Sequence, residues 1–260
     1  MTPVRAIGFD LWETLITDTP DMSKAQQRLR LVRMEEILVR HGHGALAGRL
    51  EHAHREVWHR CHDLYWSRDE DIPCRRQIEH LLEELGLDPR SLSESALSAL
   101  EDAYATAAVE IPPAVVDGAA GALAALKDRG LGIGLVSNTG RTPGSALREI
   151  LAQAGLAQFI DVMVFSNEHG VCKPQTSIFD ELRRGLGTSF SEMLFVGDNT
   201  YVDVYGAQRA GMRAIHFDPP VRGTAVAPHV EAGEEVVPFA RVTRLRDVVA
   251  LVDERMKDEG

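Results

Sequence analysis

Residues 4–15 have the sequence VRAIGFDLWETL, which contains the first strand that the sequence predicts. A short apolar run ends in one carboxylate, Asp10, and Thr14 follows four residues later. An apolar run without alternation is typical of a strand that is buried on both faces of a parallel sheet. Asp10 would then lie at the carboxyl end of that strand, where open α/β sheets bind their ligands. The stretch alone leaves a second interpretation open, in which Asp10 only caps the next turn.

Strand and helix patterns alternate in the second half of the chain. Apolar strands are expected at 131–136, 159–165, 193–196 and 214–217, and helices at 117–129, 145–154, 177–186 and 201–210. Residues 219–237 are rich in Pro, Gly and Ala and are expected to form a surface loop before a last helix at 245–256. Repeated strand–helix units predict a parallel sheet with right-handed crossovers, so the expected fold class is a Rossmann-like α/β core.

A helical segment separates the first strand from the rest of this core. Helices are expected from about Asp21 to His41, at 46–65, at 75–85 and from about Ser91 onward, with no convincing strand among them. Pro112 and Pro113 end the segment. We therefore expect a core domain made of residues 1–16 and 111–260, and an inserted all-helical cap domain at 17–110.

The composition restricts the partners and the compartment. The 260 residues carry a formal net charge of −11, which argues against a nucleic-acid or anionic-membrane surface but not against a small anionic substrate. The three cysteines imply no disulfide framework. No signal peptide is recognised at the start, and no apolar stretch has the length of a membrane span. The expectation is a cytoplasmic protein, either a monomer or a homodimer, that binds a small molecule.

Polar residues follow three of the expected strands: Asp10, Ser137 and Asp198. Because parallel strands end at one edge of the sheet, these side chains should converge. A carboxylate such as Asp10 can act as a nucleophile, and Mg²⁺ can bridge two close carboxylates while it holds a substrate phosphate. Ser137 and the backbone N–H groups after it can hold phosphoryl oxygens. Lys173 can add a positive charge near the nucleophile, although a solvated lysine is the other interpretation.

The chain resembles the hydrolases of the haloacid dehalogenase (HAD) superfamily that have a helical cap inserted after the first motif. The four motifs of that superfamily match DLWETL at 10–15, SNT at 137–139, Lys173-Pro174, and GDNTYVD at 197–203. The matches occur in the correct order and cover the core. They are specific for the superfamily and poorly specific for the substrate.

The resemblance implies a role for each matched residue. Asp10 would be the nucleophile, and Lys173 would assist it in catalysis. The residues that would hold the phosphoryl group are Thr14, Ser137, Asn138 and Lys173. The ligands of a Mg²⁺ cofactor would be Asp10, Asp198, Asp203 and the backbone carbonyl of Trp12.

One position departs from the pattern of the superfamily's phosphatases. They usually carry a second aspartate two residues after the nucleophile, as the general acid for the leaving group, and here that position is Trp12. Loss of a positioned proton donor costs roughly 10²–10⁴ in rate. Glu13 is a poor substitute, because adjacent residues of an extended segment point to opposite faces. An acyl or aryl phosphate would be affected less than an alkyl phosphate.

Three functions therefore stay open. The first is a Mg²⁺-dependent phosphatase that acts on a small phosphorylated metabolite through an aspartyl-phosphate intermediate. The second is a metal-independent 2-haloacid dehalogenase, since those enzymes also place an aromatic residue at the position of Trp12. The first is favoured, because dehalogenases of this type avoid a carboxylate at the position of Asp198, where it would raise the pKa of a neighbouring carboxyl in the absence of metal. The third is a scaffold that has lost its activity.

The expected second helix of the cap carries an unusual set of polar and aromatic residues. Its possible zinc ligands are His52, His54, His59, Cys61 and His62. Scattered surface histidines are the favoured interpretation. Trp58, His59, Tyr65 and Trp66 either cover the site and select the substrate or form the cap's own core, and the second is favoured.

Overall fold

A parallel sheet of six strands forms the centre of the protein, for which the computed structural model describes residues 3–223 and 236–258. The strand order is β5-β4-β1-β6-β7-β8, and every neighbouring pair is parallel. The strands are β1 (Ala6–Phe9), β4 (Gly132–Ser137), β5 (Val162–Phe165), β6 (Met193–Gly197), β7 (Arg213–Phe217) and β8 (Ala240–Val242). This arrangement confirms the predicted Rossmann-like α/β fold.

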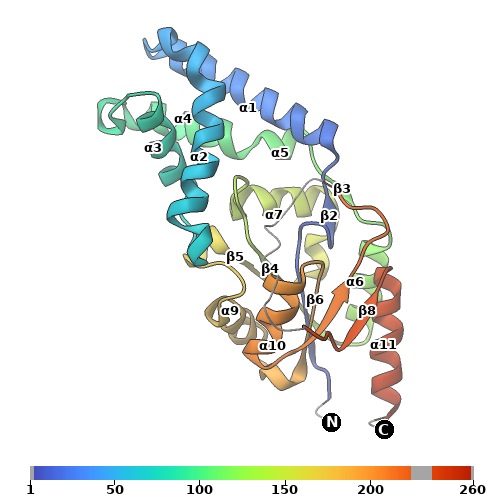
Figure 1. Ribbon diagram of the computed structural model, residues 1–260. Helices are drawn as coiled ribbons and strands as arrows, with labels where there is room; N and C mark the ends of the chain where they lie inside the picture. Colours follow the sequence, from blue (N-terminus) through green and yellow to red (C-terminus); the bar gives the residue numbers. More distant parts are fainter. Residues whose placement is uncertain (1–2, 224–235, 259–260) are drawn as a thin grey trace.

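Helices cover both faces of the sheet (Figure 1). One face packs against α6 (Ala119–Asp128), α7 (Gly144–Gln153) and α11 (Leu245–Asp258), and the other against α9 (Thr176–Leu186) and α10 (Gly206–Ala210). Strand β1 alternates between the two layers: Ile7 and Phe9 belong to the first hydrophobic cluster and Ala6 to the second. A Cβ at Gly8 would lie 2.8 Å from Cδ2 of Leu182, so the glycine lets α9 approach the sheet closely.

The helical segment from α1 to α5 lies beyond one end of the sheet (Figure 1). Its helices are α1 (Pro20–Arg40), α2 (Leu50–Leu64), α3 (Cys74–Glu84), α4 (Glu94–Ala105) and α5 (Ala107–Glu110). Residues of α1 to α4 enclose a hydrophobic cluster of their own. The chain enters and leaves through two short antiparallel strands, β2 (Ile16–Thr17) and β3 (Ala114–Val115). We propose that this helical group is a cap domain with the boundaries expected from the sequence.

Several predicted elements differ in detail from the observed ones. The helix expected at 46–65 divides into a 3₁₀ segment, Gly44–Arg49, and α2. The helix expected at 201–210 begins as a π-helical turn, Thr200–Tyr205, that continues into α10. Strand β8 was not predicted, because a three-residue edge strand gives too short a pattern. Most of the loop expected at 219–237 lies outside the described residues. In the described part of the chain no helix has the length and apolarity needed to span a membrane.

Candidate active site

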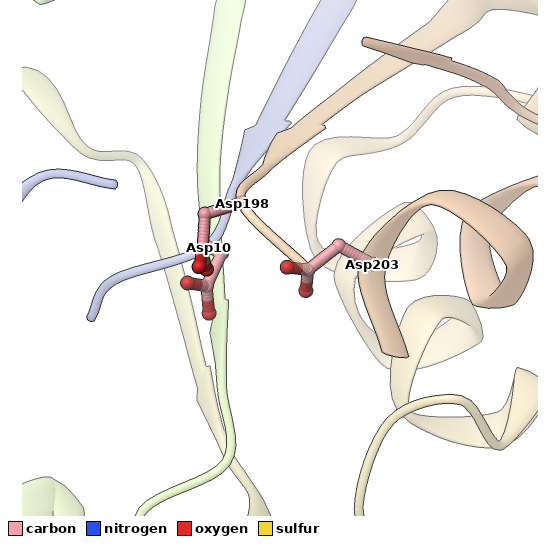
Figure 2. Close-up of side chains that lie close together, drawn as sticks. All are labelled: Asp10, Asp198 and Asp203. Carbon is pink, nitrogen blue, oxygen red and sulfur yellow. The ribbon is translucent and has the colours of Figure 1, made fainter. Parts of the chain in front are cut away.

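Three aspartates meet at the carboxyl edge of the two central strands. Asp10 directly follows β1, Asp198 directly follows the neighbouring β6, and Asp203 lies in the π turn after β6. One carboxylate oxygen of each lies within 4.8 Å of those of the other two. Figure 2 shows Asp203 pointing toward the Asp10 and Asp198 side chains from the start of the following helix. Among the described residues no other group of three His, Cys, Asp or Glu side chains meets in this way.

The local sequence explains why Asp203 turns toward the strand end. A Cβ at Gly197 would collide with the Asp203 carboxylate, so only glycine fits there. The Asn199 side chain accepts hydrogen bonds from the N–H groups of Tyr201 and Val202 and thereby caps the turn. The backbone N–H of Asn199 also donates to Oδ2 of Asp203 at 3.0 Å. The glycine and the capping asparagine therefore fix the two acidic residues relative to each other.

Lys173 joins the carboxylates of Asp10 and Asp203. Its Nζ donates to Oδ1 of Asp10 at 2.5 Å and to Oδ1 of Asp203 at 2.7 Å, and the lysine is only 2% exposed. Burial alone would lower the pKa of Lys173, but the two carboxylates raise it above its ordinary value, so the side chain stays charged. Asn138 accepts from the backbone N–H of Lys173 at 2.8 Å and donates to its carbonyl at 3.1 Å. The Asn138 side chain thus positions Lys173, a contact that the sequence did not predict.

The other predicted phosphoryl-binding residues also border Asp10. Oγ1 of Thr14 donates to Oδ2 of Asp10 at 3.3 Å. Ser137 ends β4, the other neighbour of β1, and is fully buried. Trp12 is half-buried, pairs with Ile16 in a short bridge and packs against the hydrophobic core. The structure therefore gathers these residues at one edge of the sheet, as their places after the strands predicted.

The close carboxylates repel one another in a buried place. Burial raises the pKa of Asp10, which Lys173 lowers and Asp203 raises further. Burial also raises the pKa of Asp198, and the charges of Asp203 and Asp10 add to that effect. A divalent cation with oxygen ligands would remove this repulsion. The donor set of three carboxylates therefore fits the expected Mg²⁺.

Arg222 is a contact of this site that the sequence did not reveal. Its Nη1 donates to Oδ2 of Asp198 at 2.9 Å, and its Nη2 pairs with Asp218 at 3.0 Å. The arginine lies in the loop after β7, and no spacing or motif connects it with residue 198. The same loop binds Glu13, whose carboxylate accepts from the N–H of Gly223 at 2.6 Å and from Oγ1 of Thr17 at 3.0 Å. Glu13 is thus engaged in a structural role.

The cap is fixed to the core through the buried residue Asp71. Its Oδ2 accepts from Oγ of Ser166 at 2.5 Å and from Oγ1 of Thr139 at 3.1 Å, and its Oδ1 accepts from Nε1 of Trp66 at 2.8 Å. The Cys172 N–H, one residue before Lys173, donates to the Asp69 carbonyl at 2.7 Å. Asp71 was not predicted from the sequence, because nothing local marks it as a residue of the interface.

The polar residues of α2 do not form one site. His54 and Cys61 are buried, whereas His52 and His59 are exposed, so they lie on different sides of the helix. Tyr65 and Trp66 pack against the cap's own cluster. Trp58 instead faces the core: the guanidinium of Arg141 lies 4.5 Å from the centre of its ring.

Comparison with known proteins agrees with this geometry. The sequence model of the haloacid dehalogenase-like hydrolases matches residues 4–211. A glyceraldehyde 3-phosphate phosphatase of Methanopyrus kandleri is 30% identical over 70% of this chain and 74% of its own length. A ribulose-1,5-bisphosphate 5-phosphatase of Halopiger xanaduensis is 28% identical over 88% of this chain and 91% of its own.

The fold also agrees with a solved structure. The crystal structure of a 2-haloacid dehalogenase from Pseudomonas syringae pv. Tomato superposes with a TM-score of 0.67 at 22% identity, covering 97% of this chain and 99% of that one. The family match spans most of the chain, including all four motifs around Asp10. The chain therefore belongs to the haloacid dehalogenase-like hydrolases and is a hydrolase.

Proposed function

We propose that the protein is a Mg²⁺-dependent phosphatase that hydrolyses small phosphorylated metabolites through a phosphoaspartyl intermediate on Asp10. The observation that carries the proposal is the arrangement of Asp10, Asp198 and Asp203 with Lys173 between two of them. The charged lysine holds an oxygen of Asp10 and favours the ionised form that attacks, against the opposing effect of burial. Three carboxylates at one point are explained by a divalent cation and a phosphate, and not by stability, since buried like charges destabilise a fold.

The reaction would proceed in two displacements at phosphorus. An oxygen of Asp10 forms a bond to the phosphorus while the bond to the leaving oxygen breaks, and that oxygen leaves as an anion or takes up a proton from solvent. A water molecule then attacks the phosphorus, the bond to Asp10 breaks, and phosphate is released. Lys173, Thr14 and Ser137 hold the phosphoryl oxygens during both steps. Mg²⁺ bound by Asp10, Asp198 and Asp203 would supply positive charge beside the transferred group.

The residues near the nucleophile favour good leaving groups. Trp12 cannot donate a proton to an alkoxide, and Glu13 is held by Thr17 and the backbone of Gly223. A leaving group that needs no positioned acid, such as a phenolate or a carboxylate, would then react fastest. Aryl and acyl phosphates are therefore the best test substrates.

Two comparisons support phosphatase chemistry. The relatives from Methanopyrus kandleri and Halopiger xanaduensis are both named as phosphatases of small sugar phosphates. Their identity to this chain is 30% and 28%, so they support the reaction class and not a particular substrate.

A second candidate is 2-haloacid dehalogenation, which Trp12 favours because it replaces the acid of the phosphatases. In that reaction Asp10 would attack carbon and expel halide, and no metal would be needed. The carboxylate of Asp198 so close to Asp10 argues against it, because a metal-free enzyme would gain nothing from the added repulsion.

A paired assay distinguishes the two reactions. Phosphate release from p-nitrophenyl phosphate is measured with Mg²⁺ and with EDTA, and chloride release from chloropropionate is measured under the same conditions. The proposal predicts Mg²⁺-dependent phosphate release and no chloride. Metal-independent chloride release would select the dehalogenase, and no product in either assay from folded protein would show that the proposal is wrong.

A further inference from the structure

Two arginines and a histidine meet where the cap contacts the core, and we name them the seam cluster: Arg30 of α1, His54 of α2 and Arg141 of the loop after β4. Nη2 of Arg141 donates to the His54 carbonyl at 3.3 Å. Arg30 is 5% exposed, and its Nε donates to the Tyr104 carbonyl at 2.7 Å. The cluster thus places the buried charge of Arg30 near the half-buried charge of Arg141.

Among the described residues, no carboxylate is paired with these two charges. Within residues 3–223 and 236–258, neither Arg30 nor Arg141 forms a salt bridge with a carboxylate. Asp18 acts on Arg30 only weakly and accepts hydrogen bonds from Gln26 and Ser23. Burial and then Arg141 and Arg30 lower the pKa of His54 to about 3, so the imidazole is neutral. A buried cation without a partner is costly, which favours the binding of an anion there.

Two buried nitrogen atoms of the cluster also lack a partner. Nε2 of His54 and Nε of Arg141 are enclosed and make no hydrogen bond in the described structure. His54 is only 2% exposed, so bulk water does not satisfy its nitrogen. Unsatisfied buried polar atoms are rare in folded proteins, and they commonly mark a place for a ligand or a bound water. The two atoms belong to His54 and Arg141, which are also joined by the hydrogen bond from Arg141 to the His54 carbonyl.

The seam cluster lies beside hydrogen bonds that join cap and core. Gln77 donates to the Gly140 carbonyl at 2.8 Å and accepts from the Tyr104 hydroxyl at 3.1 Å, which links cap and core. Arg141 follows Ser137, the last residue of β4, by four residues, and its guanidinium lies over the ring of Trp58. Arg141 is thus close in the chain to Ser137, the expected phosphoryl-binding residue, and its side chain contacts the cap at His54 and Trp58.

We propose that Arg141, Arg30 and His54 bind a second anionic group of the substrate, so that the preferred substrates are phosphate esters that carry a further carboxylate or phosphate. The inference rests on the proposed phosphatase function for the position of the first phosphoryl group. Arginine suits this task, because its planar fork binds both carboxylate and phosphate through paired hydrogen bonds. A carboxylate and a phosphate would both be bound in this way, and the choice of test substrates distinguishes between them.

The first test compares matched substrates. Phosphoserine and phosphoethanolamine differ only by a carboxylate, and fructose 1,6-bisphosphate and fructose 6-phosphate differ only by a phosphate. The wild-type kcat/KM is expected to favour at least one dianionic member by about tenfold or more. Arg141→Gln should reduce that ratio by roughly 10–100-fold and Arg141→Lys by less. Arg184→Gln, on the exposed side of α9, is the control and should retain the wild-type ratio.

A binding measurement separates this inference from the proposed function. Because Trp58 contacts Arg141, an anion on the guanidinium should change the tryptophan fluorescence. Asp10→Asn protein is titrated with each substrate pair, and the dianionic member should bind about tenfold more tightly only when Arg141 is present. Equal affinities within both pairs would overturn the second anion site even if p-nitrophenyl phosphate is hydrolysed. A clear preference in binding without any phosphate release would retain the site and contradict the phosphatase.

Discussion

The sheet edge and the seam cluster gather charges of opposite sign. At the sheet edge, three carboxylates surround one lysine. In the seam cluster, Arg30 and Arg141 lie near each other, and in the described part of the chain neither forms a salt bridge with a carboxylate. The negative region lies on strand ends and turns of the core, whereas the positive region is shared between two cap helices and a core loop. The first is suited to hold a cation and to perform chemistry, and the second to hold an anion that does not react.

This difference predicts which kinetic quantity each region controls. Groups at the sheet edge contact the reacting phosphoryl group, so their loss should lower kcat. Residues between cap and core either stabilise the closed cap or bind the end of the substrate that does not react. Loss of the first kind should favour opening of the cap, and loss of the second kind should raise KM. Because Asp10 is 6% exposed and Ser137 is fully buried, we expect that the cap opens to admit a substrate.

The largest expected effect is that of Asp10→Asn. The amide cannot act as the nucleophile, so kcat for p-nitrophenyl phosphate should fall by roughly 10⁴-fold or more. Asp180→Asn makes the same chemical change on the exposed side of α9 and is the control. A far-ultraviolet circular dichroism spectrum checks that the fold is retained. Turnover by Asp10→Asn within a few-fold of wild type would remove Asp10 from the mechanism.

Asp198→Asn should mainly change the requirement for metal. Loss of one carboxylate ligand is expected to raise the Mg²⁺ concentration for half-maximal activity by roughly 100-fold. Arg222→Gln supplies the contrast, because it frees Oδ2 of Asp198 and should lower that concentration by a few-fold. A Mg²⁺ titration of phosphate release measures both. Identical titrations for wild type and Asp198→Asn would contradict the assignment of the metal site.

Asp71→Ala should loosen the cap without touching the carboxylates. It leaves Ser166, Thr139 and Trp66 without their acceptor, which is expected to cost about 1–3 kcal/mol. Hydrogen exchange followed by mass spectrometry should show faster exchange of the Cys172 N–H, which donates to the cap at Asp69. Asp63→Ala, on the exposed surface of α2, should leave that exchange unchanged. Equal exchange in both variants would show that Asp71 does not hold the cap closed.

The smallest expected effect is a change in acid sensitivity from His54. Its folded-state pKa of about 3 lies below the unfolded value of 6.5, so between these values the unfolded chain binds a proton that the folded protein does not. Stability therefore falls as the pH is lowered through this window, by about 1–2 kcal/mol at pH 5. His54→Gln removes this contribution and should lose less stability between pH 7 and pH 5 in urea denaturation. The exposed His52→Gln is the control, and equal pH dependence of all three proteins would contradict the account of His54.

The sheet edge could be predicted because topology fixes it. Once the alternating pattern predicts a parallel sheet, Asp10, Ser137 and Asp198 must share one edge whatever the details of packing. The hydrolase resemblance then added Asp203 and Lys173 from their positions in motifs. The contact between Lys173 and the Asn138 side chain escaped prediction, because it depends on the path of two loops.

The contacts of the cap could not be predicted in the same way. Periodicity places Arg30 and His54 on helices, but it does not state which helix face turns toward the core. Asp71 and Arg222 lie in irregular segments, and their partners Ser166 and Asp198 are distant in the sequence. Such pairs depend on how segments that are distant in the sequence pack together, and no local sequence pattern encodes that packing.

The most direct test of the account is the capture of the covalent intermediate. Protein turning over p-nitrophenyl phosphate with Mg²⁺ is quenched rapidly in acid, digested and analysed by mass spectrometry. The account predicts a phosphoryl group on the peptide that contains Asp10, and no such adduct in Asp10→Asn or in EDTA. A phosphoryl group on another residue, or a propionate ester on Asp10 after incubation with chloropropionate, would contradict it.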